Sequence, residues 1–125
     1  MAIPDRRRLT EHTAFARAVL DAVDVIPRGK VMAYGDVAEY VGMGSPRGVG
    51  AVMAQWGHEV AWHRVVMADG RPAPGHEREQ LARLRKDKTP LKGERVDMNR
   101  ARWDGNVSGL RDDGGNASRR KGPQQ

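Results

Sequence analysis

Near the start of the chain, apolar residues recur at every third or fourth position. The recurrence runs through Phe15, Val19 and Val23, and polar residues fill many of the positions between them. This spacing predicts an amphipathic helix over residues 9–22, with Thr10 as its N-cap. We expect the apolar face of this helix to pack into the core of the domain.

Two further helices are predicted close together in the middle of the chain. One spans about residues 34–41 and ends at Gly42, and the other spans about 46–56, with Ser45 as N-cap and Pro46 as its first residue. Two short helices joined by a tight, glycine-bearing turn form a helix-turn-helix pattern. The pattern is compatible with DNA binding, but many helical proteins that bind no DNA contain it.

The second half of the chain is less regular. Residues 62–66 are a candidate for a short strand, and a polar helix is predicted over 77–86, with Leu81 and Leu84 facing inward. Residues 91–103 fit a strand or a pair of strands. The expected fold is therefore mostly α-helical with a short β-hairpin.

Both ends of the chain are polar. We expect a flexible basic N-terminus over 1–8, one folded domain over 9–103 and a disordered polar tail over 104–125. No run of about 18 apolar residues occurs, and no apolar stretch follows the basic start, so neither a membrane span nor a secretory signal is predicted. A cytoplasmic protein is the default, associated with the nucleoid if the source is bacterial.

Charge and cysteine content narrow the chemistry. The formal net charge of +6 favours polyanionic partners, nucleic acid first and anionic membrane second. The cysteine count of zero excludes disulfides, zinc–thiolate sites and every thiol nucleophile. His58 and His63 have no acidic or thiol companions at metal-ligand spacing, so we expect neither a metal nor a cofactor.

Three segments, in this order and spacing, carry a family resemblance: residues 26–38 (IPRGKVMAYGDVA), 45–53 (SPRGVGAVM) and 61–66 (AWHRVV). The first resembles the segment that opens the DNA-binding half of the O6-alkylguanine-DNA alkyltransferases. The second resembles their recognition helix, and the third their Pro-Cys-His-Arg-Val motif. The similarity covers about residues 9–85 and continues more weakly to Trp103. It implies a winged helix-turn-helix-like domain, as in the C-terminal domain of those enzymes.

One departure separates this chain from the active enzymes. Trp62 stands where the transferases carry their reactive cysteine, and replacement of that cysteine, often by tryptophan, marks the alkyltransferase-like subfamily. Direct dealkylation needs an activated thiolate to attack the alkyl carbon, and no residue of this chain supplies one. We therefore expect a protein that is not an enzyme.

The resemblance also implies a set of residues that contact DNA. Tyr34 would touch the phosphate backbone and help rotate the target nucleotide, and Arg47 would enter the base stack to fill the gap that the flipped base leaves. Ser45, Gly48 and Gly50 complete the set, because small residues let a helix backbone approach the minor groove closely. Without the resemblance, Tyr34 reads as a packing residue, Arg47 as a solvated one, and Gly50 as a helix-packing position.

Four consecutive residues, Trp62, His63, Arg64 and Val65, are expected to form the lesion pocket. The indole of Trp62 would stack on the extruded base, unless it is simply a core residue. His63 would support the pocket by hydrogen bonding, and Arg64 would brace the surrounding loops.

Three arginines complete the site predictions. Arg71 and Arg78 are candidates for a contact to the modified base, although neither matches the family pattern cleanly. Where the transferases carry the glutamate of their proton relay, the alignment places Arg85.

Together these features predict a monomeric protein that binds double-stranded DNA, flips out an O6-alkylguanine and directs the lesion to nucleotide excision repair proteins. No membrane partner is expected. The alternatives are a winged-helix transcriptional regulator, which would prefer a base sequence to a lesion, and a general duplex DNA-binding protein. A third alternative is a module that uses its basic tail on an acidic partner other than DNA.

Overall fold

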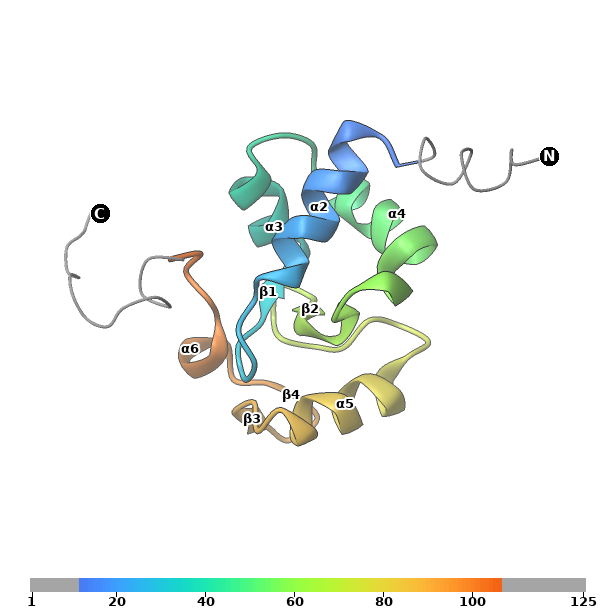
Figure 1. Cartoon of the computed structure of the whole chain (residues 1–125). Helices are drawn as coiled ribbons and strands as arrows, with labels where there is room; N and C mark the ends of the chain where they lie inside the picture. Colours follow the sequence, from blue (N-terminus) through green and yellow to red (C-terminus); the bar gives the residue numbers. More distant parts are fainter. Residues whose placement is uncertain (1–11, 107–125) are drawn as a thin grey trace.

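The computed structural model describes residues 12–106 of the 125-residue chain. Thr10, the basic N-terminus predicted over 1–8 and the predicted tail beyond Asn106 lie outside the described residues. The helices α2 (Ala14–Asp24), α3 (Tyr34–Val41) and α4 (Pro46–Trp56) pack together, and α5 (Glu77–Lys86) lies at the other end of the domain (Figure 1). No helix within residues 12–106 has the length and apolar character needed to cross a membrane.

Helix α2 begins at Ala14, so the start predicted at residue 9 is wrong. The Oγ1 atom of Thr13 accepts a hydrogen bond from the backbone N–H of Ala16 at 3.0 Å, and Thr13 itself has an extended backbone. Thr13 is therefore the N-cap. Two threonines precede the same apolar face, and the prediction chose the earlier one.

Helices α3 and α4 have the predicted bounds, because local signals fix their ends. The Asp36 carboxylate accepts the backbone N–H of Ala33 at 2.9 Å where α3 begins, and Gly42 ends α3 in the left-handed region at φ 85°. The Ser45 hydroxyl caps α4 by accepting the N–H of Gly48 at 3.1 Å. Between α2, α3 and α4 lies a core that includes five fully buried residues, Val19, Val23, Ile26, Val37 and Val49.

A short parallel pair of strands joins the two halves of the domain. Strand β1 (Met32–Ala33) pairs with β2 (Val65–Val66). The strand predicted over 62–66 is therefore only partly right, since Trp62–Arg64 form a 3-10 turn, η2, which follows the similar turn η1 (Gly57–Glu59). Backbone hydrogen bonds from Trp62 to the Val60 carbonyl (2.8 Å) and from Arg64 to the Ala61 carbonyl (3.0 Å) close η2. Trp62 thus stands outside the strand pairing.

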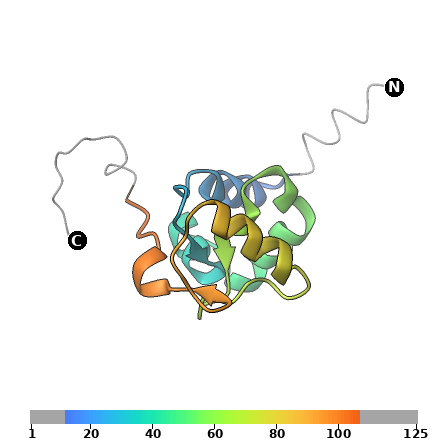
Figure 2. The same cartoon turned by 90° about the horizontal axis from the view of Figure 1, so that it is seen from below.

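Helix α5 has the bounds predicted over 77–86 and closes a second apolar cluster, in which Leu81 and Leu84 are buried as predicted. Strands β3 (Leu91–Lys92) and β4 (Arg95–Val96) form the predicted antiparallel hairpin, and the short helix α6 (Met98–Ala101) follows it. The hairpin and α5 lie at the same end of the domain (Figure 2). The prediction of a mostly helical fold with a short β-hairpin is confirmed.

Gln80, on α5, is fully buried and connects three segments. Its Nε2 atom donates to the carbonyls of His63 at 3.0 Å and Val65 at 2.8 Å, and its Oε1 atom accepts the N–H of Ala73 at 2.7 Å. Buried polar groups of this kind are stable only when they are hydrogen-bonded, and these three bonds satisfy both ends of the amide. Gln80 therefore ties η2, β2 and the loop before α5 to that helix.

Candidate functional site

A groove of about 640 Å³ opens between α4 and α5. It brings together residues that are far apart in the sequence: Gly50 and Met53 from α4, His76, Glu79 and Arg83 from the α5 region, and Tyr34 and Trp62 from the segments between. Of the residues predicted to contact DNA or a lesion, Tyr34, Gly50 and Trp62 line this groove. We call it the Trp62 groove.

Trp62 is half-buried and lines the groove, so it is not simply a core residue. The guanidinium carbon of Arg83 lies 5.4 Å from the centroid of its ring, within the range of a cation–π interaction. The ring of His76 lies 5.8 Å away and is inclined by 66°. Two side chains from α5 and its N-cap thus hold the indole in place, while it still faces the groove.

The sequence prediction missed Arg83. Its Nε and Nη2 atoms donate to Oε2 of Glu79 at 3.2 and 3.0 Å, one helical turn earlier on the same helix. Both residues line the groove, and His76 lies a further three residues back. Residues at this spacing share one face of a helix, so the predicted helix over 77–86 already held the signal. What the sequence alone does not give is the direction in which that face points.

The two arginines that were predicted to contact the modified base lie elsewhere. The Nε atom of Arg71 donates to Oδ2 of Asp69 at 2.8 Å, and Arg71 lines a different groove, on the side of the β3–β4 hairpin. Arg78 is exposed on α5 and is not among the residues that line the Trp62 groove. The structure therefore brings neither of them to Trp62.

Tyr34 begins α3 and is half-buried at the groove. Burial raises the pKa of its hydroxyl above the ordinary value, so the group stays protonated at neutral pH and can donate a hydrogen bond.

The two predicted glycines of α4 have different surroundings. A Cβ atom on Gly50 would meet nothing within 4 Å, so this position is open toward the groove. A Cβ atom on Gly48 would lie 3.3 Å from the ring of Phe15 on α2. Close helix packing therefore explains Gly48, but it does not explain Gly50.

Arg47 is exposed in the first turn of α4 and forms no ion pair or hydrogen bond with any side chain within residues 12–106. Ser45, just before it, is exposed, and its hydroxyl accepts the N-cap hydrogen bond from the Gly48 N–H. The first turn of a helix carries a partial positive charge from its free N–H groups. An exposed guanidinium at this point adds a full positive charge to the same surface.

Behind Trp62 lies a buried charged cluster of His63, Arg64 and Asp87. The Nε2 atom of His63 is 2.8 Å from Oδ2 of Asp87, and Arg64 donates to both oxygens of Asp87, at 2.9 and 3.3 Å. Arg64 also donates to the carbonyl of Ile26 at 3.0 Å, so it links the loop after α2 to the end of α5. The acid that contacts His63 is thus Asp87, whereas Arg85, which the sequence analysis aligned with the relay glutamate, is an exposed residue of α5.

Burial sets the charge state of this cluster. Desolvation lowers the pKa of His63 although Asp87 opposes the shift, so the imidazole is neutral at neutral pH. Desolvation raises the pKa of Asp87, but hydrogen bonds from Arg64 and His63 outweigh it, so the net pKa lies below the ordinary value and the carboxylate is ionised. Val65 is buried in the core beside this cluster. His63, Arg64 and Val65 therefore support the groove from behind and do not line it.

The geometry gives no indication of a metal centre. Within residues 12–106, no three histidine, aspartate or glutamate side chains lie close enough together to hold a metal ion. The groove offers instead a flat indole, a tyrosine hydroxyl and an arginine next to an open helix backbone. These groups suit stacking and hydrogen bonding with a planar heterocycle.

Comparisons with known proteins find similar DNA-binding domains. A family model for the DNA-binding domain of 6-O-methylguanine DNA methyltransferase matches residues 14–95. Alkyltransferase-like protein 1 of Schizosaccharomyces pombe is 49% identical over 59 residues, which cover 45% of this chain and 55% of that protein. The chain thus aligns with little more than half the length of that relative.

Solved structures show that the similarity includes the fold. S. pombe Atl1, in complex with damaged DNA containing O6-carboxymethylguanine, is similar with a TM-score of 0.63 and 32% identity, over 71% of this chain and 94% of that one. Mycobacterium tuberculosis O6-methylguanine methyltransferase is similar with a TM-score of 0.52 and 29% identity, over 64% of this chain and 53% of that one. The predicted winged helix-turn-helix-like domain is thereby confirmed.

Proposed function

Because this chain belongs to the family of the 6-O-methylguanine DNA methyltransferase DNA-binding domain, we propose that it recognises O6-alkylguanine in duplex DNA without repairing it. The observation that carries this proposal is the position of Trp62. An indole lines the groove, within the motif that resembles the segment in which the enzymes carry their reactive cysteine, and the chain contains no cysteine. An indole cannot act as the nucleophile that a thiolate provides, so the alkyl group stays on the base.

Duplex DNA is held by charge and by the start of α4. The net charge of +6 attracts the phosphate backbone with little sequence preference. Arg47 is exposed and forms no ion pair with another side chain within residues 12–106. It enters the base stack, where its planar guanidinium replaces the extruded base. Tyr34 stands at the mouth of the Trp62 groove with a protonated hydroxyl, which donates to a phosphate as the nucleotide rotates.

The extruded base then occupies the Trp62 groove. The groove volume of about 640 Å³ falls within the range of about 300–1,000 Å³ that is usual for small-molecule sites. Stacking on Trp62 favours any purine, and the space beside it accommodates an alkyl substituent. Extrusion costs a few kcal/mol and costs less for a damaged pair, so an O6-alkylguanine enters the groove more readily than an intact guanine.

Without bond cleavage, the complex persists until it dissociates. Such a complex marks the lesion for other proteins, and we propose that nucleotide excision repair proteins respond to it. The protein acts as a monomer in this scheme, because one groove holds one base.

Two matched duplexes test the proposal, one with guanine and one with O6-methylguanine at the same position. We expect tighter binding to the modified duplex in fluorescence anisotropy titrations at several salt concentrations. Trp62→Leu should lower this preference about tenfold, because stacking of one base contributes about 1–3 kcal/mol. Equal affinity for both duplexes would contradict lesion recognition and leave a general DNA-binding protein or a regulator.

The role of Arg47 has a matched control on the same chain. Arg47→Gln should abolish flipping, seen as loss of the rise in fluorescence of a 2-aminopurine placed next to the O6-methylguanine. Arg78→Gln removes the same charge from an exposed arginine outside the groove and should only weaken binding slightly. Incubation with duplex carrying a radiolabelled O6-methyl group should leave the label on the DNA, and its transfer to protein would show that the chain is an enzyme.

A further inference from the structure

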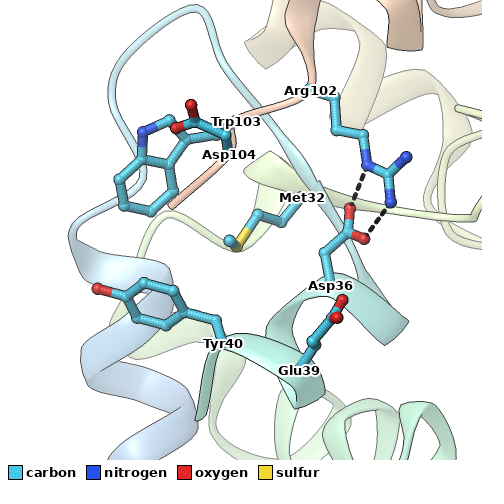
Figure 3. Close-up of a pocket in the computed structure, with 7 residues that line it drawn as sticks. All are labelled: Met32, Asp36, Glu39, Tyr40, Arg102, Trp103 and Asp104. Carbon is cyan, nitrogen blue, oxygen red and sulfur yellow. Dashed lines mark hydrogen bonds and ion pairs between the residues drawn. The ribbon is translucent and has the colours of Figure 1, made fainter. Parts of the chain in front are cut away.

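A second groove, of about 400 Å³, lies beside α3 (Figure 3). Its lining consists of Met32, three side chains of α3 and the segment 102–104. The α3 side chains are Asp36, Glu39 and Tyr40. With about 100° of rotation per residue, all three lie within about 60° of the direction opposite to Tyr34. Helix α3 therefore turns one face to the Trp62 groove and the opposite face to this second groove.

Carboxylates dominate the second groove, although the whole chain is basic. Asp36, Glu39 and Asp104 line it against a single cation, Arg102, which gives the groove a formal charge of −2 on a chain of +6. Arg102 donates from Nε and Nη2 to the two oxygens of Asp36, as Figure 3 shows, so this carboxylate is neutralised.

Neither of the other two carboxylates forms a hydrogen bond or ion pair with a cationic side chain within residues 12–106, although Arg102 attracts Glu39 at longer range. Glu39 forms no hydrogen bond or ion pair there, and it is exposed on α3. The Asp104 carboxylate accepts the backbone N–H of Asn106 at 2.8 Å, which leaves its charge uncompensated. Two negative charges therefore face the groove and are available to a ligand.

Aromatic rings form the other part of the groove. The ring of Tyr40, 39% exposed, lies 5.7 Å from the ring of Trp103 at an angle of 39°. The chain passes close to Tyr40 at Gly105, where φ is 81° and a Cβ atom would come within 3.0 Å of the ring. The electron-rich faces of such rings attract cations, and their apolar surface suits the methylene stem of a long basic side chain.

We propose that this acidic and aromatic groove binds an arginine-bearing segment of a partner protein. The guanidinium lies between the Glu39 and Asp104 carboxylates and over the Tyr40 ring, with its stem along Met32 and Trp103. Arginine fits this combination better than lysine, because its planar group both stacks and donates to two carboxylates. The same carboxylates repel DNA phosphates, so the duplex is not the occupant.

This surface goes beyond lesion recognition, since it gives the domain a second, separate binding face. A duplex held by α4 and the Trp62 groove leaves the opposite face of α3 open. The domain then bridges damaged DNA and a basic protein segment, each on its own side of α3.

The test uses the full chain and a fluorescein-labelled peptide of alternating serine and arginine. We expect saturable binding in anisotropy titrations that weakens with ionic strength. The double variant Glu39→Gln/Asp104→Asn should bind this peptide about tenfold more weakly, because each exposed charge contact contributes up to about 1 kcal/mol. Tyr40→Leu should weaken binding of this peptide more than binding of the matching lysine peptide, because Leu keeps the bulk but removes the ring.

A charge-matched control is Asp21→Asn/Glu94→Gln, which removes two exposed carboxylates outside this groove and should leave peptide binding unchanged. Absence of peptide binding, or equal loss in the control, would overturn the proposal. A rise in peptide affinity when residues 107–125 are removed would assign the groove to the chain's own tail, and groove-dependent self-association would assign it to a second copy; either result overturns it. Affinity for the O6-methylguanine duplex is measured on the same variants, so a failure of lesion recognition is seen separately.

Discussion

Asp87→Asn is the substitution that best tests how the cluster behind Trp62 is held together. The change keeps the shape of the side chain and removes its charge. In the folded protein, the Asp87 side chain is 9% exposed, that of His63 10% and that of Arg64 18%. The substitution therefore leaves the Arg64 guanidinium largely buried without its anion, and an amide nitrogen in place of one accepting oxygen.

The expected cost follows from this burial. Removing one partner of a fully buried ion pair costs about 3–5 kcal/mol, and exposed pairs contribute about 0–1 kcal/mol. Arg64 is nearer the buried limit, it keeps its bond to the Ile26 carbonyl, and the amide oxygen still accepts, so we expect about 2–3 kcal/mol of lost unfolding free energy. For a domain of this size, that loss lowers Tm by roughly 8–24 °C.

Thermal and urea unfolding, followed by circular dichroism at pH 7, measure this loss. The control is Glu79→Gln, which neutralises a carboxylate that also accepts two bonds from one arginine, but whose side chain is 57% exposed. We expect the control to lose less than about 0.5 kcal/mol. Equal stability of Asp87→Asn and the wild type would refute the argument that Asp87 compensates a buried charge.

Further predictions concern pH, helix α4 and Tyr34. Because the pKa of His63 is lowered in the folded protein, the imidazole of the unfolded chain is protonated first as the pH falls, so stability is full above about pH 6.5 and declines below it. Between pH 7.5 and 5.5, the urea midpoint of His63→Gln should therefore fall less than that of the wild type. Equal falls in the two proteins would exclude His63 as the source of the pH dependence. Gly50→Ala should raise the unfolding free energy by about 0.5–1 kcal/mol, because the site is open and helix propensity improves, yet it should weaken DNA binding. Gly48→Ala should raise the unfolding free energy less, because the ring of Phe15 must move. Calorimetry measures the stability of both variants, and duplex titrations measure their DNA binding. Tyr34→Phe should keep the Tm but reduce flipping in the 2-aminopurine assay, and unchanged fluorescence would remove the hydroxyl from the mechanism.

The helix-turn-helix could be predicted from sequence because its signals are local. The ends of α4 are set by Ser45, Pro46 and an uninterrupted apolar repeat, all within a few residues of each other. At α2, two threonines precede one apolar face, and both fit the sequence pattern of an N-cap. Only the observed hydrogen bond from the Ala16 N–H to Thr13 shows which of them caps the helix. The residues 62–66 were read as a strand from their apolar character, but short-range backbone bonds make the first three a 3-10 turn.

The groove was harder to predict, because it depends on contacts between distant segments. Trp62 was identified by its place in a motif, but Arg83 reaches it only because α5 packs against the turn η2. Asp87 was missed for a similar reason, since it pairs with His63 across 24 residues. Neither pairing has a signature in residue spacing. Arg71 was one of two candidates named for their nearness in sequence, and the fold places it in the groove beside the hairpin, away from Trp62.

Gln80 has a consequence for how selectivity arises. It bonds the turn that carries Trp62 to the helix that carries Arg83, so this side of the Trp62 groove is held in place by the fold itself. Under the proposed function, a groove side that is held in place leaves the distortion to the double helix. We then expect selectivity to follow how easily each base pair opens, so that chemically different adducts that loosen pairing to the same degree are bound alike.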